Sequence, residues 1–233
     1  MLKERVSSGI PNLDPHIGGG FVKGSINLIS GGTGSGKTIA LAHFLYEGAE
    51  KGENSIYISL EQDVINVKND LKALGFDFDK LEAQKKCKFI YIGPFAQKDI
   101  QDQLLKEIAR YKAERVAIDS ISVYAMALKS DLDIRRNIYT IASLLKRIGC
   151  TVLLTSEVVG EVPLDVTSGG GSFSRYGIEE FISDSVITLH SSGLGGAFDR
   201  ALRIVKMRRT SHTKGPIPMQ ISNKGISLST RKQ

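Results

Sequence analysis

Short apolar runs alternate with longer amphipathic segments over the first two thirds of the chain. The apolar runs have the length of strands and contain few polar residues, as expected where helices cover both faces of a parallel sheet. Their alternation with helical segments indicates repeated βαβ units. We therefore expect an α/β fold with a mainly parallel sheet, whose strands occupy residues 25–30, 54–60, 88–92, 115–119 and 151–156.

Helical periodicity is clearest between positions 131 and 148. Isoleucine and leucine recur there at steps of three and four while basic residues occupy the other side, which predicts an amphipathic helix. The same spacing from Ile100 to Tyr111 marks a second helix. After about position 184 the pattern changes to strands separated by Gly-rich turns, which predicts that the C-terminal third is antiparallel.

The chain shows no Pro/Ser-rich linker, low-complexity block or internal repeat, so we expect residues 1–233 to form a single domain. Its hydrophobic content of 41% is enough for a core of that size. No uninterrupted apolar stretch approaches the ~20 residues that cross a bilayer, and no apolar run follows the basic N-terminal residues. We therefore expect a cytoplasmic protein without a membrane-spanning segment.

Composition adds few constraints on the chemistry. Cys87 and Cys150 each open an apolar run, which favours reduced thiols in the core over a disulfide. The four histidines are scattered without ligand spacing, so no structural metal site is expected. The net charge of +6 permits a polyanionic partner without requiring one.

The segment GGTGSGKT, residues 31–38, satisfies the phosphate-loop pattern GxxxxGK[ST] and lies between an expected strand and an expected helix. Glycines let backbone N–H groups turn toward phosphate oxygens, and the helix N-terminus adds partial positive charge. Lys37 is expected at the β- and γ-phosphates of ATP, and the Thr38 hydroxyl at Mg²⁺. The alternative is a flexible turn followed by an exposed lysine. The predicted nucleotide-binding residues of the loop are Gly32, Thr33, Gly34, Ser35, Gly36, Lys37 and Thr38.

Two acidic residues follow expected strands and complete the predicted catalytic set with Lys37. Asp119 ends the run 115–119 and faces the crevice where such sheets bind ligands, which suits a Mg²⁺ ligand acting through water. Its alternative is a turn or a helix N-cap. Glu61 directly follows the run 54–60 and is placed to orient or deprotonate the attacking water. Its alternative is a helix-start glutamate.

Three residues at the end of the run 151–156 are secondary candidates for sensing the γ-phosphate. A plain strand terminus explains them almost as well. They are Thr155, Ser156 and Glu157.

The stretch SSGIPNLDPHIGGG, which begins at Ser7, resembles the opening of the KaiC-like branch of the RecA superfamily, in which it precedes the phosphate loop. The match continues in ISLEQ, RVAIDS, RYGIEEFISDSV and KMRRTSHTKG, from about Ser8 to Gly225. The chain is also similar to the stand-alone archaeal RadA paralogues, which consist of the same RecA-type core. It carries one repeat where KaiC carries two, so clock function does not transfer.

The resemblance implies that ATP lies between neighbouring subunits, with the KMR of one subunit reaching the γ-phosphate held by the other. Here these cations are Lys206 and Arg208, whose spacing places them on one face of a strand. The following residues, Thr210, Ser211 and His212, are implied near ribose and base. The alternative is a solvated basic edge strand.

The chain departs from the family at the glutamate pair after the second strand, which is Glu61-Gln62 here. The second carboxylate is absent, so a general-base role shared by two glutamates is in doubt. Glu180 and Phe181 occupy the phosphoacceptor positions of KaiC's second repeat. The chain therefore resembles the ATPase repeat rather than the autokinase repeat.

Two functions remain open, and we favour the first. In the first, a RadA paralogue binds single-stranded DNA and modulates recombination or repair together with a RadA-type recombinase. In the second, a KaiC-like signalling ATPase uses its ATP state to control assembly or partner binding without nucleic acid. Monomer, ring and filament all share this core, so the oligomeric state is not predicted.

The predicted DNA contacts fall in two regions. The Gly-rich segment 158–177 lies where RecA proteins carry a mobile DNA-binding loop, although it contains a single basic residue, and the alternative is an interface or pore loop. Its aromatic residues are expected to stack on bases. The residues predicted to contact DNA in this segment are Phe173, Arg175 and Tyr176. A second group, Arg200, Arg203 and Arg209, is predicted to form a patch that contacts the DNA backbone.

Overall fold

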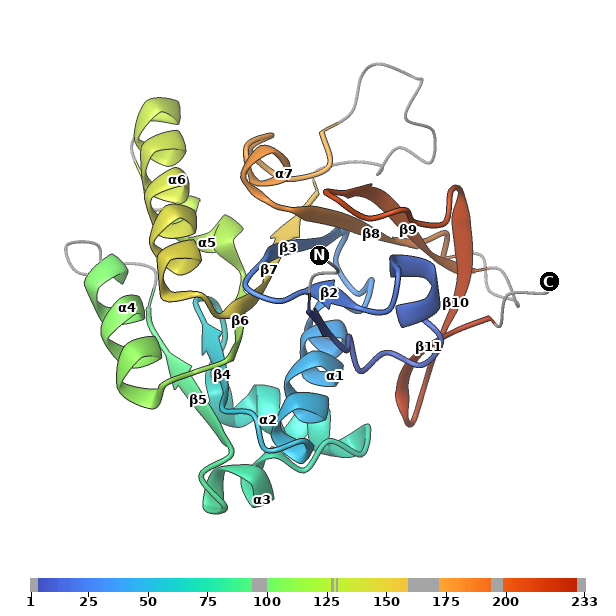
Figure 1. Ribbon diagram of the computed structural model, residues 1–233, viewed down its shortest axis with the longest axis horizontal. Helices are drawn as coiled ribbons and strands as arrows, with labels where there is room; N and C mark the ends of the chain where they lie inside the picture. The colour runs from blue at the N-terminus through green and yellow to red at the C-terminus, as the bar shows by residue number, and fades with distance from the viewer. Residues whose placement is uncertain are drawn as a thin grey trace.

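The computed structural model describes residues 4–93, 100–126, 128, 130–158, 172–193 and 199–229. Within them a nine-stranded sheet has the order β11-β10-β9-β8-β3-β7-β6-β4-β5 (Figure 1). Its parallel strands are β3 (Ile26–Gly31), β4 (Ser55–Ser59), β5 (Cys87–Tyr91), β6 (Arg115–Asp119), β7 (Thr151–Glu157) and β8 (Ser185–Ser191). The antiparallel strands are β9 (Arg200–Met207), β10 (Pro216–Ser222) and β11 (Gly225–Leu228).

The sheet confirms the predicted parallel core and corrects the predicted start of the antiparallel part. β8 pairs parallel with β3, for example Ser30 with Thr188, and antiparallel with β9. The change of direction therefore falls one strand later than expected. β8 lies between β9 and β3 and is buried along most of its length. The Gly-rich turns that follow position 191 in the sequence do not show which strands are its neighbours.

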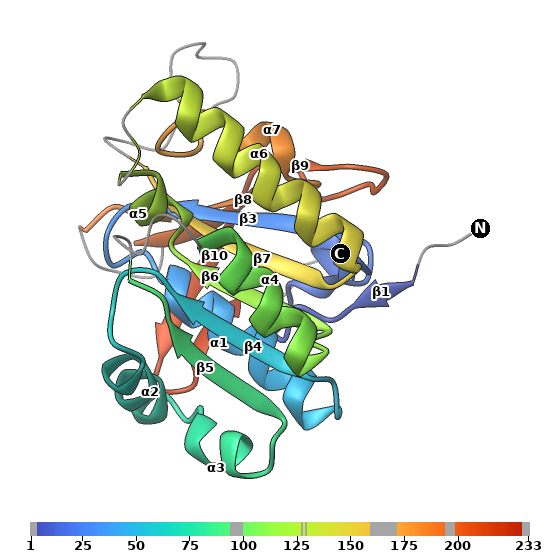
Figure 2. The ribbon, with the colours of Figure 1, turned by 90° about the vertical axis from the view of Figure 1, so that its left-hand side faces the viewer.

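Helices cover the two faces of the sheet (Figures 1 and 2). One apolar cluster joins the sheet to α1 (Lys37–Glu50), α2 (Val64–Ala73) and α3 (Phe78–Ala83). The other joins it to α4 (Ile100–Tyr111), α5 (Ile121–Met126) and α6 (Asp131–Ile148). The remaining elements are a 3₁₀ helix (Asp14–Ile17), the small pair β1 (Arg5–Val6) and β2 (Phe21–Val22), and α7 (Glu179–Ile182).

Local signals explain why α6 has the predicted bounds. The Ser130 side chain caps the helix by accepting a hydrogen bond from the Asp133 N–H, and Gly149 ends it in the left-handed conformation. Ile134, Ile138, Ile141 and Leu145 are buried. The basic face of the helix therefore remains at the surface.

The two cysteines are buried free thiols, as expected. Burial raises the pKa of Cys150 to about 11, so the thiol stays protonated near neutral pH. Within the described part of the chain, no helix is long and apolar enough to cross a membrane.

Candidate nucleotide-binding site

The phosphate loop connects β3 to α1, as the motif predicts. Gly34 and Gly36 have φ of 71° and 103°, a region that disfavours residues with a Cβ, so the loop needs glycine at both positions. Gly36 is the N-cap of α1, and its carbonyl accepts the first helical hydrogen bond, from the Ala40 N–H (3.0 Å). The loop therefore leads directly into a helix N-terminus, where N–H groups face outward.

The Lys37 side chain reaches back across the phosphate loop to its first residues. Its Nζ donates to the carbonyls of Gly31 (3.0 Å) and Gly32 (2.9 Å). Burial lowers the pKa of the ammonium, and this is opposed by the negative charges of Glu157, Asp119 and Glu61. The lysine thus carries its charge at the centre of the loop, among three carboxylates.

Three hydroxyl groups converge on Asp119 at the end of β6. Its Oδ2 accepts hydrogen bonds from Tyr57 Oη (2.6 Å) and Thr38 Oγ1 (2.8 Å), and its Oδ1 accepts one from Thr155 Oγ1. The donors come from β4, α1 and β7, so the strand order fixes this carboxylate from three directions. Thr155, a candidate for sensing the γ-phosphate, is one of the three groups that orient Asp119.

Sequence reasoning missed Tyr57. Burial, followed by the nearby charge and hydrogen bond of Asp119, raises its pKa well above the ordinary value, so the hydroxyl remains a donor. A tyrosine inside an otherwise apolar strand, two residues before the strand ends, was the available signal.

A cavity of about 140 Å³ lies beside the loop and brings together the three predicted catalytic residues, Lys37, Glu61 and Asp119. Ser120 and Val67 also line it. Besides Ser120, the described residues around it with polar or charged side chains are Thr33, Lys37, Thr38, Tyr57, Ser59, Glu61, Gln62, Asp119 and Glu157.

Glu61 lines this cavity and is exposed. Loss of hydration raises the pKa of its carboxyl, the charges of Asp119 and Glu157 raise it further, and Lys37 opposes them. The N-cap of α2 is Asp63, which accepts from the Ile65 N–H (2.8 Å). Glu61 therefore lies before the helix and is not needed to start it.

The candidate phosphate-sensing residues Ser156 and Glu157, at the end of β7, lie on opposite faces of the strand. Glu157 lines the cavity and pairs with Arg175 (3.3 Å). Ser156 is buried on the other side, where its Oγ contacts Ser122 Oγ (3.0 Å) and donates to Glu179 Oε1 (3.0 Å). Ser156 is therefore not among the described residues at the cavity, contrary to the prediction that it senses phosphate.

Arg200 contacts the phosphate loop, which the sequence did not indicate. Its NH1 donates to the Gly34 carbonyl (2.8 Å) from the first residue of β9. β9 runs antiparallel to β8, so it begins at the edge of the sheet where β3 ends. Arg209 lies at the opposite end of β9 and pairs with Asp184 (3.4 Å). The predicted DNA patch of Arg200, Arg203 and Arg209 is therefore not one continuous surface.

Lys206 and Arg208 bind α7 rather than the phosphate loop of their own chain. Lys206 Nζ donates to the carbonyls of Glu180 and Ser183 (both 2.7 Å), and Arg208 NH2 to that of Phe181 (3.1 Å). β9 ends at Met207, so Arg208 lies just beyond the strand, although the two side chains lie on one side, toward α7. Neither is among the described residues that line the cavity.

The residues predicted near ribose and base also lie away from this cavity. Thr210 Oγ1 accepts from Arg5 NH2 (2.9 Å), and His212 Nδ1 lies 3.1 Å from the Thr213 carbonyl. Ser211 is exposed between them. All three therefore lie on the Lys206 side of the molecule.

The predicted DNA loop falls largely on residues 159–171, outside the described residues. Of its predicted contacts, Phe173 and Tyr176 are partly buried against the core, and Arg175 pairs with Glu157. These three side chains are therefore engaged within the chain itself.

A mainly parallel sheet with a phosphate loop after β3 and an acidic residue ending β6 defines a P-loop ATPase core of the RecA type. The family model described as "ATPase: KaiC" matches residues 6–233, and the chain belongs to this family, in the KaiC-like branch of the RecA superfamily. The predicted resemblance to that branch is confirmed.

Relatives of two lengths match the chain. It is 34% identical over 245 residues to a UPF0273 protein of Thermotoga maritima, covering 98% of this chain and 96% of that protein. It is 30% identical over 232 residues to the circadian clock protein KaiC3 of Synechocystis, covering 95% of this chain but 44% of KaiC3. The chain thus spans less than half the length of this clock relative.

A solved structure is similar over the whole chain. The crystal structure of the KaiC-like protein PH0186 from Pyrococcus horikoshii has a TM-score of 0.86 and 34% sequence identity. The alignment covers 98% of this chain and 100% of that one.

Proposed function

We propose that this protein is a Mg²⁺-dependent ATPase that binds ATP on the phosphate loop and hydrolyses it beside Glu61. The observation that carries the proposal is the hydrogen bond between Thr38 Oγ1 and Asp119 Oδ2 (2.8 Å) at the foot of the loop. A hydroxyl and a carboxylate oxygen side by side are ligands that Mg²⁺ prefers.

The loop residues fit a polyphosphate. The Lys37 ammonium is bonded to two neutral carbonyls and lacks a directly bonded anion among the described residues. The buried Ser35 hydroxyl has no hydrogen-bond partner among them either. Phosphate oxygens would satisfy both groups, and the helix N-terminus adds favourable partial charge.

When bound, ATP would supply the phosphoanhydride bond, and Mg²⁺ would neutralise the charge that develops on its phosphate oxygens. Lys37 would bind the β- and γ-phosphate oxygens, while Thr38 and Asp119 would hold the metal. Tyr57 and Thr155 keep Asp119 in one orientation. Glu61 would orient the attacking water and accept its proton. Its pKa is raised, which makes the carboxylate a stronger base.

We propose that Lys206 and Arg208 complete the site of a neighbouring copy. Their position on the α7 side, away from their own phosphate loop, supports this arrangement. Thr210, Ser211 and His212 lie on the same side and would approach the ribose and base of that neighbour's nucleotide. Assembly through this face, a role in recombination with a RadA-type recombinase, and ATP-controlled signalling all remain predictions.

The experiment compares phosphate release by the wild-type chain and the Lys37→Ala variant. We expect the variant to lose hydrolysis and to bind ATP more weakly, because the charge at the phosphates is gone. Lys51→Ala is a matched control, since Lys51 caps the opposite end of the same helix and pairs with Glu47 at the surface. Unchanged turnover in Lys37→Ala would overturn the proposal.

A further inference from the structure

The carboxylate of Glu179 is 0% exposed and forms no ion pair within the described part of the chain. Its Oε1 accepts a hydrogen bond from Ser156 Oγ (3.0 Å). Its Oε2 accepts one from Ser174 Oγ (2.7 Å) and one from the Ile178 N–H (3.1 Å). Burying a carboxylate is costly unless hydrogen bonds replace its hydration. The surroundings of Glu179 are therefore built to donate to both of its oxygens.

A chain of hydroxyl groups connects Glu179 to the nucleotide cavity. Because a carboxylate only accepts, Ser156 donates to it, and Ser122 Oγ in turn donates to Ser156 Oγ (3.0 Å). The Glu157 N–H begins the chain by donating to Ser122 Oγ (3.0 Å). Arg175 adds a second connection, because its backbone N–H donates to Ser156 Oγ (3.1 Å) and its guanidinium pairs with Glu157 (3.3 Å). The end of β7 is thus bonded to Glu179 by two routes.

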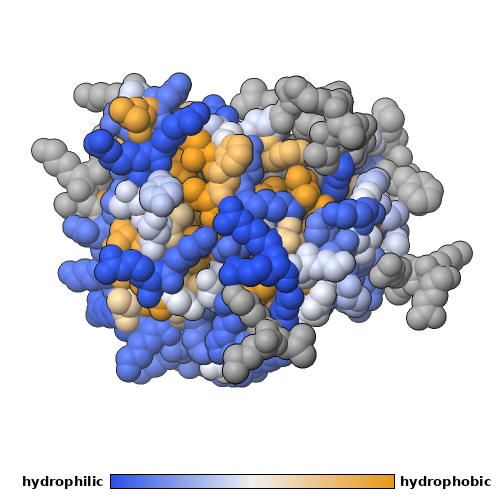
Figure 3. Space-filling model, turned by 45° about the horizontal axis from the view of Figure 1, so that its top comes forward, coloured by the Kyte–Doolittle hydropathy of each residue, from blue (hydrophilic) through white to orange (hydrophobic). Residues whose placement is uncertain are grey.

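Glu179 anchors α7, a single helical turn at the surface. It is the only buried residue of the four in this helix. Phe181 is 72% exposed, and Ile178 and Ile182 are partly buried. Figure 3 shows hydrophobic residues on this side of the molecule beside strongly hydrophilic ones. Because apolar packing leaves the outer side of α7 open, the position of the helix depends on the hydrogen bonds of Glu179.

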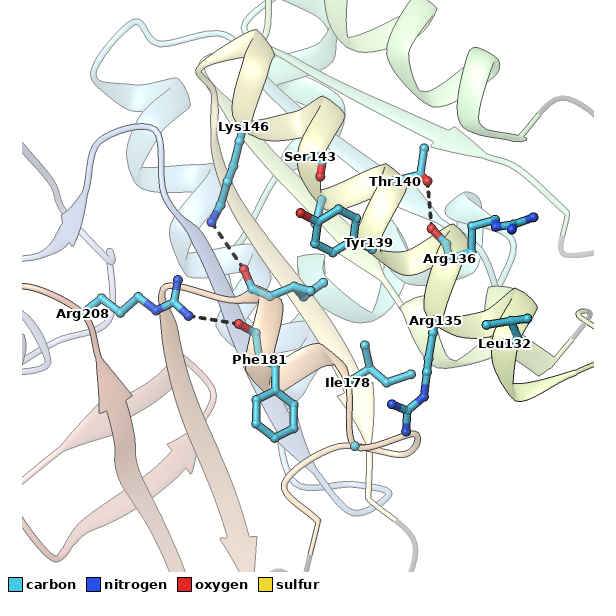
Figure 4. Close-up of a pocket in the computed structure, with 13 residues that line it drawn as sticks. Leu132, Arg135, Arg136, Tyr139, Thr140, Ser143, Lys146, Ile178, Phe181 and Arg208 are labelled. Atoms are coloured by element: carbon cyan, nitrogen blue, oxygen red, sulfur yellow. Dashed lines mark hydrogen bonds between the residues drawn. The ribbon is translucent and has the colours of Figure 1, made fainter.

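The backbone of α7 holds the two cations that we assign to the nucleotide of a neighbouring copy. Lys206 Nζ donates to the carbonyl of Glu180 (2.7 Å). Figure 4 shows Arg208 bonded to the carbonyl of Phe181, at 3.1 Å. A carbonyl orients a cation without cancelling its charge. Asp184 lies 4.0 Å from Arg208, but two other cations share its carboxylate. Both cations therefore keep positive charge for the phosphates of a partner.

We propose that Glu179 is a positioning residue for the nucleotide site of the neighbouring copy. It fixes α7 to the end of β7 and so determines where Lys206 and Arg208 stand when they reach that copy's γ-phosphate. This inference rests on the proposed function of those two cations.

The test mixes purified subunit variants and measures phosphate release at constant total protein. Glu179→Gln has one accepting oxygen, so its amide nitrogen would face a group that donates, and α7 should shift. Alone, this variant should lose about tenfold or more in turnover, because a small misplacement of a catalytic group is costly. Mixed with Lys37→Ala, whose α7 is intact, it should regain activity severalfold. Mixed with Arg208→Ala it should regain none, because every subunit then has an intact phosphate loop and lacks a correctly placed arginine.

Two further variants separate the bond to β7 from a general loss of charge. Ser156→Ala removes the hydroxyl that joins Glu179 to β7, and it should show the same pattern of recovery with a smaller loss. Glu180→Gln is the matched control, because its carboxylate accepts from Ser172 and Ser174 in the segment before α7. It should turn over ATP like the wild-type chain. Circular dichroism and light scattering check that every variant folds and assembles.

Four results would overturn the proposal. The first two are wild-type turnover in Glu179→Gln alone and an equal loss in Glu180→Gln. The third is recovery with Arg208→Ala instead of Lys37→Ala, which would show that Glu179 acts on the nucleotide site of its own chain. The fourth is recovery in neither mixture while Arg208→Ala and Lys37→Ala still complement each other, which would make Glu179 purely structural.

The mixture of Arg208→Ala with Lys37→Ala tests the cations without Glu179. If that pair does not complement in subunits shown to assemble together, the assignment of the two cations fails and this inference fails with it. Hydrolysis of ATP on the phosphate loop is tested separately by Lys37→Ala alone, so it stands or falls independently.

Discussion

The hydroxyl of Tyr57 donates a hydrogen bond to Asp119 from the neighbouring strand, with 2.6 Å between the two oxygens. Tyr57 is 1% exposed, and its ring stacks on Phe89 with the centroids 4.7 Å apart. The hydroxyl is therefore held in place by packing, and it fixes the carboxylate that we assign to Mg²⁺.

Changing Tyr57 to phenylalanine should raise the Mg²⁺ concentration needed for half-maximal ATP turnover. The ring packing is kept, but Asp119 loses one of its donors, and a hydrogen bond to a charged group contributes about 1.5–3 kcal/mol. We expect roughly a tenfold effect. Tyr46→Phe is the control, because the Tyr46 ring packs against Phe76 and Phe78 away from the site. A Mg²⁺ requirement equal to that of the control would contradict the assignment.

Changing Glu61 to glutamine should leave ATP bound while lowering turnover by about 10²-fold or more. A general base works when deprotonated, so wild-type activity should fall as the pH drops through the pKa of Glu61, which is raised above its ordinary value. Glu157→Gln removes one of the charges that raise this pKa, so it should move the acid limb to lower pH. Normal hydrolysis by Glu61→Gln, with loss in Glu157→Gln, would instead make Glu157 the base.

Mixing Arg208→Ala subunits with Lys37→Ala subunits should restore part of the ATPase activity that each variant lacks alone. In such a mixture one interface combines an intact phosphate loop with an intact arginine. The control mixes Lys206→Ala with Arg208→Ala, where every interface lacks one cation. Absence of recovery in subunits shown by light scattering to assemble together would favour the basic edge-strand alternative.

The sequence predicts elements better than it predicts contacts between them. The strand 115–119 and the helix 131–148 have the predicted bounds, because a continuous apolar run and a capped amphipathic pattern are local signals. The phosphate loop, Asp119 and Glu61 also lie together as expected, since the carboxyl ends of parallel strands share one edge of the sheet.

Contacts that depend on strand order could not be predicted. Tyr57 reaches Asp119 because β4 lies beside β6, and Arg200 reaches Gly34 because β9 starts near the end of β3. Grouping Arg200 with Arg209 by sequence proximity failed for a related reason: an extended strand carries residues nine positions apart to opposite ends of the sheet.

Changing Gly48 to alanine should destabilise the fold, although alanine is the better helix former. Gly48 lies in α1 over the Arg115 side chain, and an added Cβ would overlap its Cδ and Nε. Arg115 is 1% exposed and its guanidinium donates to the carbonyls of Ser7 and Phe44 (both 2.8 Å), so it has no room to move. We expect a loss of about 1–3 kcal/mol in the free energy of unfolding measured with urea. Equal or greater stability than wild type would show that Arg115 can be displaced.

His43 joins α1 to the N-terminal segment and to β11 as a neutral imidazole. Its Nε2 accepts a hydrogen bond from the Ile226 N–H (2.8 Å), so the ring proton lies on Nδ1 and is donated to the Gly9 carbonyl (3.0 Å). Burial lowers the pKa of the ring to about 4, against a weaker opposing effect of the Gly9 hydrogen bond and the charge of Glu47. Protonation would cost the ring its hydrogen bond to Ile226.

The folded protein should therefore lose stability as the pH falls from about 6.5 toward about 4, because the unfolded chain binds a proton that the folded state rejects. Between about pH 7.5 and about pH 5 this one group should lower the free energy of unfolding by about 2 kcal/mol. His43→Gln should be less stable at neutral pH, yet its urea midpoint should depend less on pH over that range. His212→Gln is the control, since His212 lies in the segment between β9 and β10 and does not touch α1, and its pH dependence should match that of the wild-type chain. An unchanged pH dependence in His43→Gln would mean that other groups govern the acid stability of the fold.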